Sequence, residues 1–166
     1  MAAASSFDVT STIDFQEVDN ALNQARKEVG QRYDFKGARA DIELNTAEKK
    51  LTLTADDEFK MNALWEIILT RLVRRGVPVK NFKDTHSEPA AGGTVRRVID
   101  IQQGIPIEAA REIVKFIKEK KMKKVQASIQ ADQVRVSSPS KDELQEAMRQ
   151  LREHDFGIAL QFGNYR

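Results

Sequence analysis

The two histidines, His86 and His154, are the side chains that most readily exchange protons near neutral pH. Neither has a second histidine three or four positions away, the spacing that a helical zinc site uses. The sequence has no G-x-S-x-G, Walker or dinucleotide glycine motif, and it has no cysteine for a disulfide or a thiolate metal site. These absences predict a protein that is not an enzyme and that holds no metal ion or other cofactor.

The stretch QRYDFKG, residues 31–37, offers binding chemistry instead of catalysis. It places two aromatic rings beside Arg32 and Lys36, and a ring next to a guanidinium can hold a base and its phosphate. If the stretch is extended, Tyr33 and Phe35 point to opposite sides, so that one ring is buried and the other is exposed. The simpler alternative is that these residues only join a helix to a strand, with Gly37 allowing a tight turn.

A cluster of lysines in KFIKEKKMKK, residues 115–124, is the strongest concentration of charge in a chain whose net charge is only +2. Such a cluster attracts phosphates, which makes Lys115, Lys118, Lys121 and Lys124 candidates for contact with nucleic acid. The alternative is the solvated face of a helix. The spacing of Arg71 and Arg75, which also occurs in some cyclic-dinucleotide binders, is a weaker match because the accompanying motif is missing.

The composition is that of a globular protein, with 40% hydrophobic and 31% charged residues among 166. No apolar run approaches the roughly 20 residues that span a bilayer, so we expect no membrane association. The start, MAAASSFDVTST, has neither a basic leader nor an apolar segment, so no export signal is expected. With cysteine absent as well, we expect a cytoplasmic location.

Helical and strand periods alternate along the chain. Apolar residues recur at helical spacing within residues 18–29, 61–72, 110–117 and 144–151, each predicting a helix with one buried face. Between these segments the period changes to two, which predicts half-buried strands. The predicted strands lie around Phe7, Ala40, Leu51, Val77, Ile99, Ala127, Val134 and Phe162. The order is therefore βαββαβ followed by βαββαβ.

This repetition predicts an α+β protein of two tandem ferredoxin-like (split βαβ) domains. Each domain would be a four-stranded antiparallel sheet with two helices on one face. Both periods lapse in HSEPAAGGT, residues 86–94, where Pro and Gly gather, so the pattern alone places the boundary there. Each core would be small, and we expect the two to pack on one another.

The outward face of the second predicted sheet carries hydrogen-bonding side chains rather than rings. It combines Asp8 and Thr10 with Gln126, Ser128 and Arg135. The common RNA reader of this fold stacks bases on aromatic residues of its central strands, and that platform is missing here. This face is therefore either an exposed polar surface or one that grips a polar ligand or the companion domain.

Several of these segments together resemble the YajQ family. They are RYDFKG at 32–37, IELN at 42–45, KVQASIQ at 124–130, QVRV at 133–136 and the ending LQFGNYR at 160–166. The resemblance covers residues 5–166, and the first and last of these motifs make it specific. Relatives commonly have Phe where Tyr165 stands, and residues 86–97 diverge from the family pattern.

The resemblance implies that the two ferredoxin-like domains exchange their first strands. The first domain would be 13–103, with its sheet completed by the strand 94–103. The second would be 104–166 plus the strand 5–12. It also implies a nucleotide ligand, with ATP, GTP, tRNA and cyclic di-GMP all reported in the family, and for some members a transcription factor or DNA as a partner.

We therefore hypothesise a nucleotide site near the cleft between the domains. Its residues would be Arg32, Tyr33, Lys36, Arg135, Asn164 and Arg166, the last two from an ending that again combines aromatic and basic side chains. The function would be regulatory nucleotide binding without catalysis. The rival hypothesis is an adaptor that contacts a protein or DNA and modulates transcription, with nucleotide binding incidental.

Overall fold

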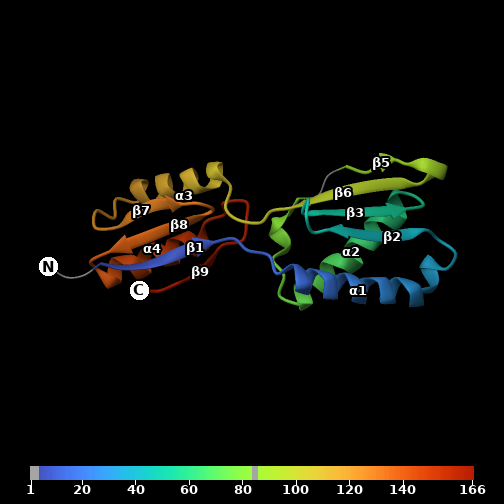
Figure 1. Ribbon diagram of the computed structural model, residues 1–166, viewed down its shortest axis with the longest axis horizontal. Helices are drawn as coiled ribbons and strands as arrows, with labels where there is room; N and C mark the ends of the chain where they lie inside the picture. The colour runs from blue at the N-terminus through green and yellow to red at the C-terminus, as the bar shows by residue number, and fades with distance from the viewer. Residues whose placement is uncertain (1–3, 84–85) are drawn as a thin grey trace. The chain divides into compact units, whose positions relative to one another are not determined.

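The computed structural model describes residues 4–83 and 86–166, and it divides the chain into two compact units. One unit is Ile13–Gln102, and the other comprises the residues up to Thr12 together with those from Gln103 onward. Each unit contains one antiparallel sheet and two long helices (Figure 1). The mixed α+β class that the periodicity predicts is therefore confirmed. The segment expected to lack an export signal lies partly outside the described residues.

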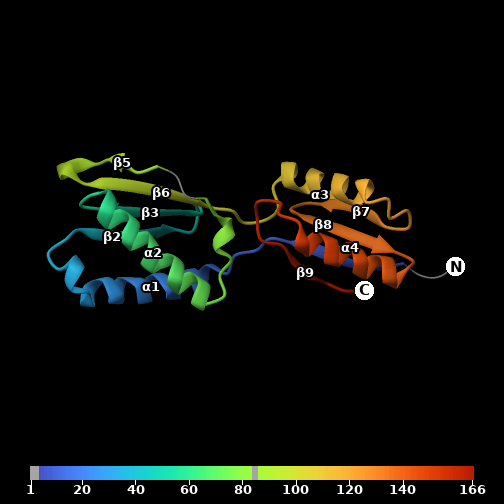
Figure 2. The same cartoon turned by 180° about the vertical axis from the view of Figure 1, so that it is seen from behind.

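In the unit that contains both chain ends, the sheet has the order β7-β8-β1-β9. Its strands are β1 (Ser5–Thr10), β7 (Gln126–Gln130), β8 (Gln133–Ser138) and β9 (Gln161–Gly163), and its helices are α3 (Ile107–Glu119) and α4 (Lys141–Glu153). The first strand of the chain thus lies between two strands from its last third. Figure 2 shows β7, β8 and both helices of this unit from behind.

The unit Ile13–Gln102 has a sheet of order β2-β3-β6-β4, with β5 also paired to β6. Its strands are β2 (Ala40–Asn45), β3 (Lys50–Ala55), β4 (Phe82–Lys83), β5 (Glu88–Pro89) and β6 (Val95–Ile101), and its helices are α1 (Phe15–Gln31) and α2 (Glu58–Arg74). Whether β1 and β6 are exchanged first strands stays a prediction, as do the domains 13–103 and 104–166 with 5–12.

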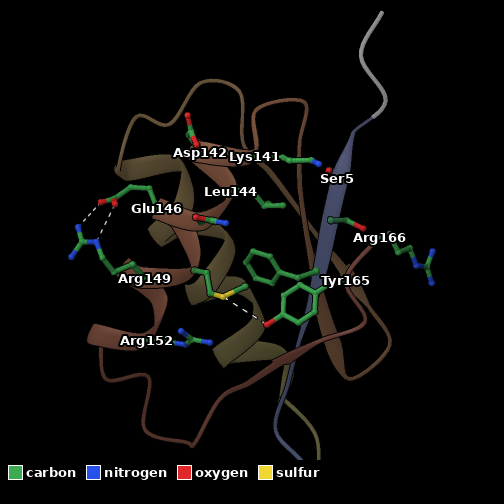
Figure 3. A pocket seen from close by; sticks show the side chains of 13 residues that line it. Ser5, Lys141, Asp142, Leu144, Glu146, Arg149, Arg152, Tyr165 and Arg166 are labelled. Carbon is green, nitrogen blue, oxygen red and sulfur yellow. Dashed lines mark hydrogen bonds and ion pairs between the residues drawn. The ribbon is translucent and has the colours of Figure 1, made fainter.

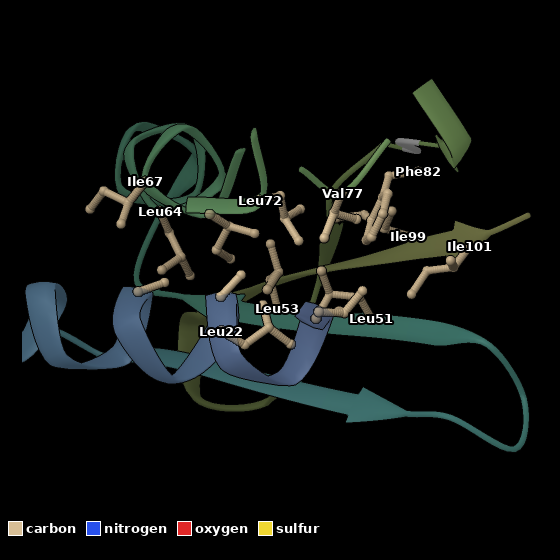
Figure 4. Close-up of a cluster of buried hydrophobic side chains, with 14 of the residues drawn as sticks. Leu22, Leu51, Leu53, Leu64, Ile67, Leu72, Val77, Phe82, Ile99 and Ile101 are labelled. Atoms are coloured by element: carbon tan, nitrogen blue, oxygen red, sulfur yellow. The ribbon is translucent and has the colours of Figure 1, made fainter. Parts of the chain in front are cut away.

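Each sheet buries one face against its two helices. In the unit that contains both chain ends, Phe7 and Val9 lie opposite Val136 and Val134, and all four are fully buried beneath α3 and α4. In the other unit, Leu51 lies opposite both Leu44 and Ile99. Figure 4 shows this second cluster, in which leucines of α1 and α2 meet Leu51 and Leu53 of β3. Alternate residues of each strand therefore supply the core, as the two-residue period predicts.

Local residues mark the ends of these helices. Ser140 caps α4 by accepting from the Glu143 amide, and Asp57 caps α2 by accepting from the Lys60 amide. Gly76 has φ +75° and follows α2, where the Val77 amide donates to the Leu72 carbonyl. This Schellman arrangement satisfies the last carbonyls of the helix.

Three expectations about elements were wrong. The alternation of Val77 and Val79 does not form a strand, because Val77 closes the end of α2 and Pro78 begins the 3-10 turn Val79–Asn81. Residues 86–94 are not a boundary, because β5 pairs with β6 inside one unit. The lysine segment is not one helix, because α3 ends at Glu119. No helix of the described residues is long and apolar enough to span a membrane.

The position of β1 predicts where a core mutation acts. Phe7→Ala removes a fully buried ring from the core formed with α3 and α4, which should cost about 3–5 kcal/mol. We expect hydrogen exchange to accelerate in β8 and α3, far from residue 7 in the sequence, while α2 stays protected. Leu53→Ala is the matched control and should show the opposite pattern. Faster exchange confined to Ile13–Gln102 in the Phe7 variant would contradict this assignment.

Candidate functional site

The stretch 31–37 forms a joint between α1 and the strand that follows. The 3-10 turn Tyr33–Phe35 comes directly after α1 and Arg32, and Gly37 has φ +75°. Phe35 is only 4% exposed, whereas Tyr33 is 88% exposed, so the expected division into one buried and one exposed ring is confirmed. The segment is a turn rather than an extended piece, and the buried ring anchors it to the core.

Arg32 is engaged by its own neighbours. Its Nη2 lies 2.7 Å from Asp34 Oδ2, and its Nη1 lies 3.5 Å from Glu28 Oε2. The hydrogen bond to Asp34 raises the pKa of Arg32 and lowers the pKa of Asp34. Of the three predicted ligand-binding residues in this stretch, Tyr33 and Lys36 are exposed, while a phosphate would have to compete with two carboxylates for Arg32. A ligand role for this stretch stays a prediction.

Arg71 and Arg75 form ion pairs that link α2 to α1. Arg71 Nη2 lies 2.7 Å from Glu28 Oε1, and Arg75 Nε lies 2.9 Å from Glu17 Oε2, both across the contact between α2 and α1. These partners account for the spacing of the two arginines without a ligand.

Asp8 organises the open face of the other sheet. The register places it between Arg135 of β8 and Gly163 of β9. Arg135 Nε donates to Asp8 Oδ1 at 3.0 Å, and Asn164 Nδ2 donates to Asp8 Oδ2 at 2.6 Å. The carboxylate is consequently buried, with the residue 5% exposed, and these two donors lower the pKa of Asp8. Asp8 is therefore not part of a solvated face, because Arg135 of β8 pairs with its charge and Asn164, which follows β9, donates to its second oxygen.

Arg135 and Asn164, two of the predicted site residues, thus lie close together because both donate to Asp8. The same bonds that hold Arg135 and Asn164 in place occupy the groups that a ligand would use. Sequence reasoning placed Asp8 and Arg135 on one face of the sheet, but it missed the burial of Asp8 and the contact with Asn164, because the bonded residues are separated by 127 and 156 positions. The only local signal is an acid between Phe7 and Val9, which the alternation assigned to solvent. Arg32, Tyr33 and Lys36 belong to the other unit, so the joint site stays a prediction.

The chain beyond β9 is held against β1. Asn164 has φ +53°, a left-handed conformation that asparagine tolerates better than most residues. The Arg166 amide donates to the Ser6 carbonyl at 3.0 Å, and the Ser6 amide donates to the Arg166 carbonyl at 3.3 Å. Tyr165, between Asn164 and Arg166 in the sequence, is 62% exposed, and its hydroxyl lies 3.4 Å from the Phe162 carbonyl.

A groove of about 720 Å³ lies between this ending, the first residues of β1 and one face of α4. Figure 3 shows Arg149 and Glu146 on its α4 side and Arg166 on its β1 side. The Tyr165 hydroxyl lies 3.9 Å from Met148 Sδ. Four cationic side chains and two acidic ones contribute to the lining: Lys141, Arg149, Arg152 and Arg166, with Asp142 and Glu146. Of the predicted site residues, Arg166 lines this groove.

The cations of the groove differ in how firmly they are held. Arg149 is paired with Glu146 and, at 2.9 Å, with Glu153, and the first of these bonds lowers the pKa of Glu146 to about 2. The Arg152 guanidinium lies 5.0 Å from the centre of the Phe162 ring, a cation–π contact, and no carboxylate of the described residues is paired with it. Arg152 and Lys141 are thus better placed than Arg149 to receive an anion.

Comparison with known proteins gives the family. The family model described as "Nucleotide-binding protein YajQ-like" matches residues 5–166. The chain belongs to the YajQ-like family. It is 47% identical to a protein of Carboxydothermus hydrogenoformans, with all of both chains covered, and 48% identical to a protein of Solibacter usitatus, with 97% of this chain and 96% of the other covered. A third relative, from Elusimicrobium minutum, is 47% identical over 97% of this chain and 98% of its own. Each of the three is named a nucleotide-binding protein.

Membership in the YajQ-like family covers both units, so the groove and the stretch 31–37 both fall within the matched residues. The residues that sequence reasoning missed are Lys141, Arg149 and Arg152, which α4 contributes to the groove. Their spacing of eight and then three positions keeps them on one side of a helix. That spacing could have been read from the sequence, but the groove opposite it could not.

The predicted nucleic-acid contacts are exposed but do not share one helix. Lys115 and Lys118 belong to α3, whereas Lys121 and Lys124 follow its end, and Lys121 has φ +56°. Lys115 lies 3.8 Å from Glu119, a weak surface pair. Among the described residues, no group of three or more histidine or acidic side chains is placed to hold a metal ion.

Asp8 should make this unit sensitive to acid. Because its folded pKa is lowered, its contribution is present above the unfolded pKa of about 3.9 and is lost as the pH falls through the folded value. Asp8→Asn should cost about 1–3 kcal/mol at pH 7 and flatten the loss of stability below about pH 4. Denaturant unfolding of both proteins from pH 7 to pH 3, followed by NMR signals of β8, measures this.

The matched control is Asp41→Asn. Asp41 pairs with Arg39 at 2.7 Å, but both side chains are more than half exposed, so little stability should be lost. Equal effects of the two variants would show that burial of Asp8 by Arg135 and Asn164 adds nothing.

Proposed function

We propose that this chain binds a nucleotide without converting it, and that the groove between α4, β1 and the residues after β9 holds the ligand. The observation that carries the proposal is the pairing of an exposed ring, Tyr165, with the cations Arg152 and Lys141 along one groove. A tyrosine face accepts any base by stacking, and guanidinium and ammonium groups neutralise phosphate. The names of the relatives support the same class of ligand.

The dimensions favour a small ligand. Sites for small molecules commonly enclose about 300–1,000 Å³, and the groove has about 720 Å³. This is suitable for a mononucleotide such as GTP or ATP, or for a cyclic dinucleotide such as cyclic di-GMP, whereas a tRNA could insert only one end. Lys141 is the first residue of α4, where the positive end of the helix dipole adds to its charge.

The role that we propose for the bound nucleotide is regulatory. The serine hydroxyls in the groove, on Ser5 and Ser6, have no hydrogen bond to a histidine or a carboxylate of the described residues, and the acids of the groove are engaged with arginine or lie at the start of α4. A protein that binds a nucleotide without such groups acts by changing what else it contacts. A transcription regulator is the class of partner that we propose for that step.

Titration calorimetry of the full chain with cyclic di-GMP, GTP and ATP tests the site. Tyr165→Ala and Arg152→Ala should each weaken binding about ten-fold or more, because each removes a stacking or a phosphate contact. Tyr33→Ala is the control, since it removes the other exposed tyrosine, which lies in the other unit.

The control also decides between the two candidate sites. If Tyr33→Ala, Arg32→Ala or Lys36→Ala abolishes binding while Tyr165→Ala binds like the wild type, the groove is not the site and the stretch 31–37 is. Wild-type affinity in all of these variants, with the fold intact, would remove both stretches from the site.

A second function, contact with tRNA or DNA, is favoured by the exposure of Lys115, Lys118, Lys121 and Lys124. We propose this contact for a nucleic acid that is too large for the groove. If the chain acts as an adaptor, it would do so through this contact. Binding through these lysines should weaken steeply as salt rises, whereas a pocket for one nucleotide should respond less. The double variant Lys118→Glu with Lys121→Glu should lower tRNA affinity about ten-fold and reduce its salt dependence. Unchanged tRNA binding would exclude the lysine cluster.

A further inference from the structure

The strand β7 is an edge strand whose outer side is unpaired. Its neighbour on one side is β8, and no strand of the described chain lies on the other, so a row of backbone N–H and C=O groups faces outward. Its sequence, QASIQ, has no charge, no proline and no glycine, and Ile129 is 37% exposed. Proteins ordinarily protect such an edge with charges, proline or a bulge.

The sequence of β7 is nearly the same in both directions. In an antiparallel pair centred on Ser128, Gln126 lies opposite Gln130 of a second copy, Ala127 lies opposite Ile129, and Ser128 meets its own counterpart. Ala127 and Ile129 point to the helix side of the sheet, since their partners in β8 are the buried Val136 and Val134. This two-fold register pairs all five residues and matches apolar with apolar and polar with polar side chains.

The charges at the two ends of the strand agree with the same register. The paired register ends at Gln126 and Gln130, since Ala131 has φ +56° and the chain then turns into β8. The two-fold axis nevertheless brings the turn that carries Lys124 of one copy to the same end of the pair as the turn that carries Asp132 of the other, and it repeats this at the opposite end. Both residues are exposed, and Asp132 lies in the turn that leads into β8. Opposite charges at the same end of the pair favour this antiparallel arrangement.

The corresponding edge of the other sheet lacks these properties. β2 also ends its sheet, but it carries Asp41 and Glu43. A two-fold pair centred on Ile42 places Asp41 opposite Glu43, and one centred on Glu43 places that acid opposite itself, so both registers are repulsive. Arg26 Nη2 also donates to the Ile42 carbonyl at 2.8 Å. The remaining outer strands, β4, β5 and β9, have only two or three residues.

From the register and the charges we propose that two copies of this chain associate through antiparallel pairing of β7 with β7, joining two four-stranded sheets into one. The partner is a second copy because the strand complements itself, and its ends carry the charges that a two-fold axis requires. The proposal does not depend on nucleotide binding, since the groove beside α4 has no β7 residue in its lining.

Sedimentation velocity over a concentration series of the full chain tests the association. The wild type should change from monomer to dimer as concentration rises. Lys124→Asp should weaken the dimer about ten-fold, because it gathers two carboxylates at each end of the pair. Asp132→Lys should do the same, and the double variant Lys124→Asp with Asp132→Lys should restore the wild-type dimer.

Ile129→Lys provides a second test, since a lysine pointing from an edge strand is a common protection against pairing. It should abolish the dimer, while circular dichroism confirms that the fold is kept. A wild type that stays monomeric at every concentration would overturn the proposal. So would a dimer that survives Ile129→Lys, or one in which the double variant remains as weak as the single reversals.

Discussion

The pairing of β1 with β8 and β9 is the interaction on which the unit containing both chain ends depends. It places a strand from the start of the chain at the centre of a sheet built from its last third. Phe7 and Val9 fill the core on one side of that strand, while Asp8 binds Arg135 and Asn164 on the other. One short segment therefore fixes the core, the polar face and the course of the last residues at once.

The groove is a consequence of that pairing. Ser6 exchanges two backbone hydrogen bonds with Arg166, so β1 holds the residue next to Tyr165 at the edge of α4. Without these bonds the exposed ring and the helix cations would have no fixed relation, and a site must hold its groups in place before the ligand arrives. Asp8 contributes through Asn164, whose left-handed backbone turns the chain beyond β9.

The arginines divide between architecture and binding according to their partners. Arg71 and Arg75 are paired with glutamates of α1, Arg135 with Asp8, and Arg32 with Asp34 and Glu28. Arg152, by contrast, rests on the ring of Phe162 beside the groove. A guanidinium whose N–H groups are already bonded to carboxylates has few left for a phosphate. The distance to acidic side chains therefore distinguishes Arg152 from the other arginines better than exposure does.

The sequence by itself determined the elements and the class of fold, because periodicity and caps are local properties of the chain. The four helices, the buried parity of Phe7, Leu51 and Val134, and the caps at Asp57 and Ser140 all follow from neighbours within a few positions. Family resemblance added the likeness to nucleotide-binding proteins, which the comparisons bear out for the family. Tertiary structure alone decided that Asp8 is buried and that α4 faces Tyr165 across a groove. Those features join residues up to 156 positions apart. A local sequence pattern does not indicate which distant side chain will pair with a buried charge or line a groove.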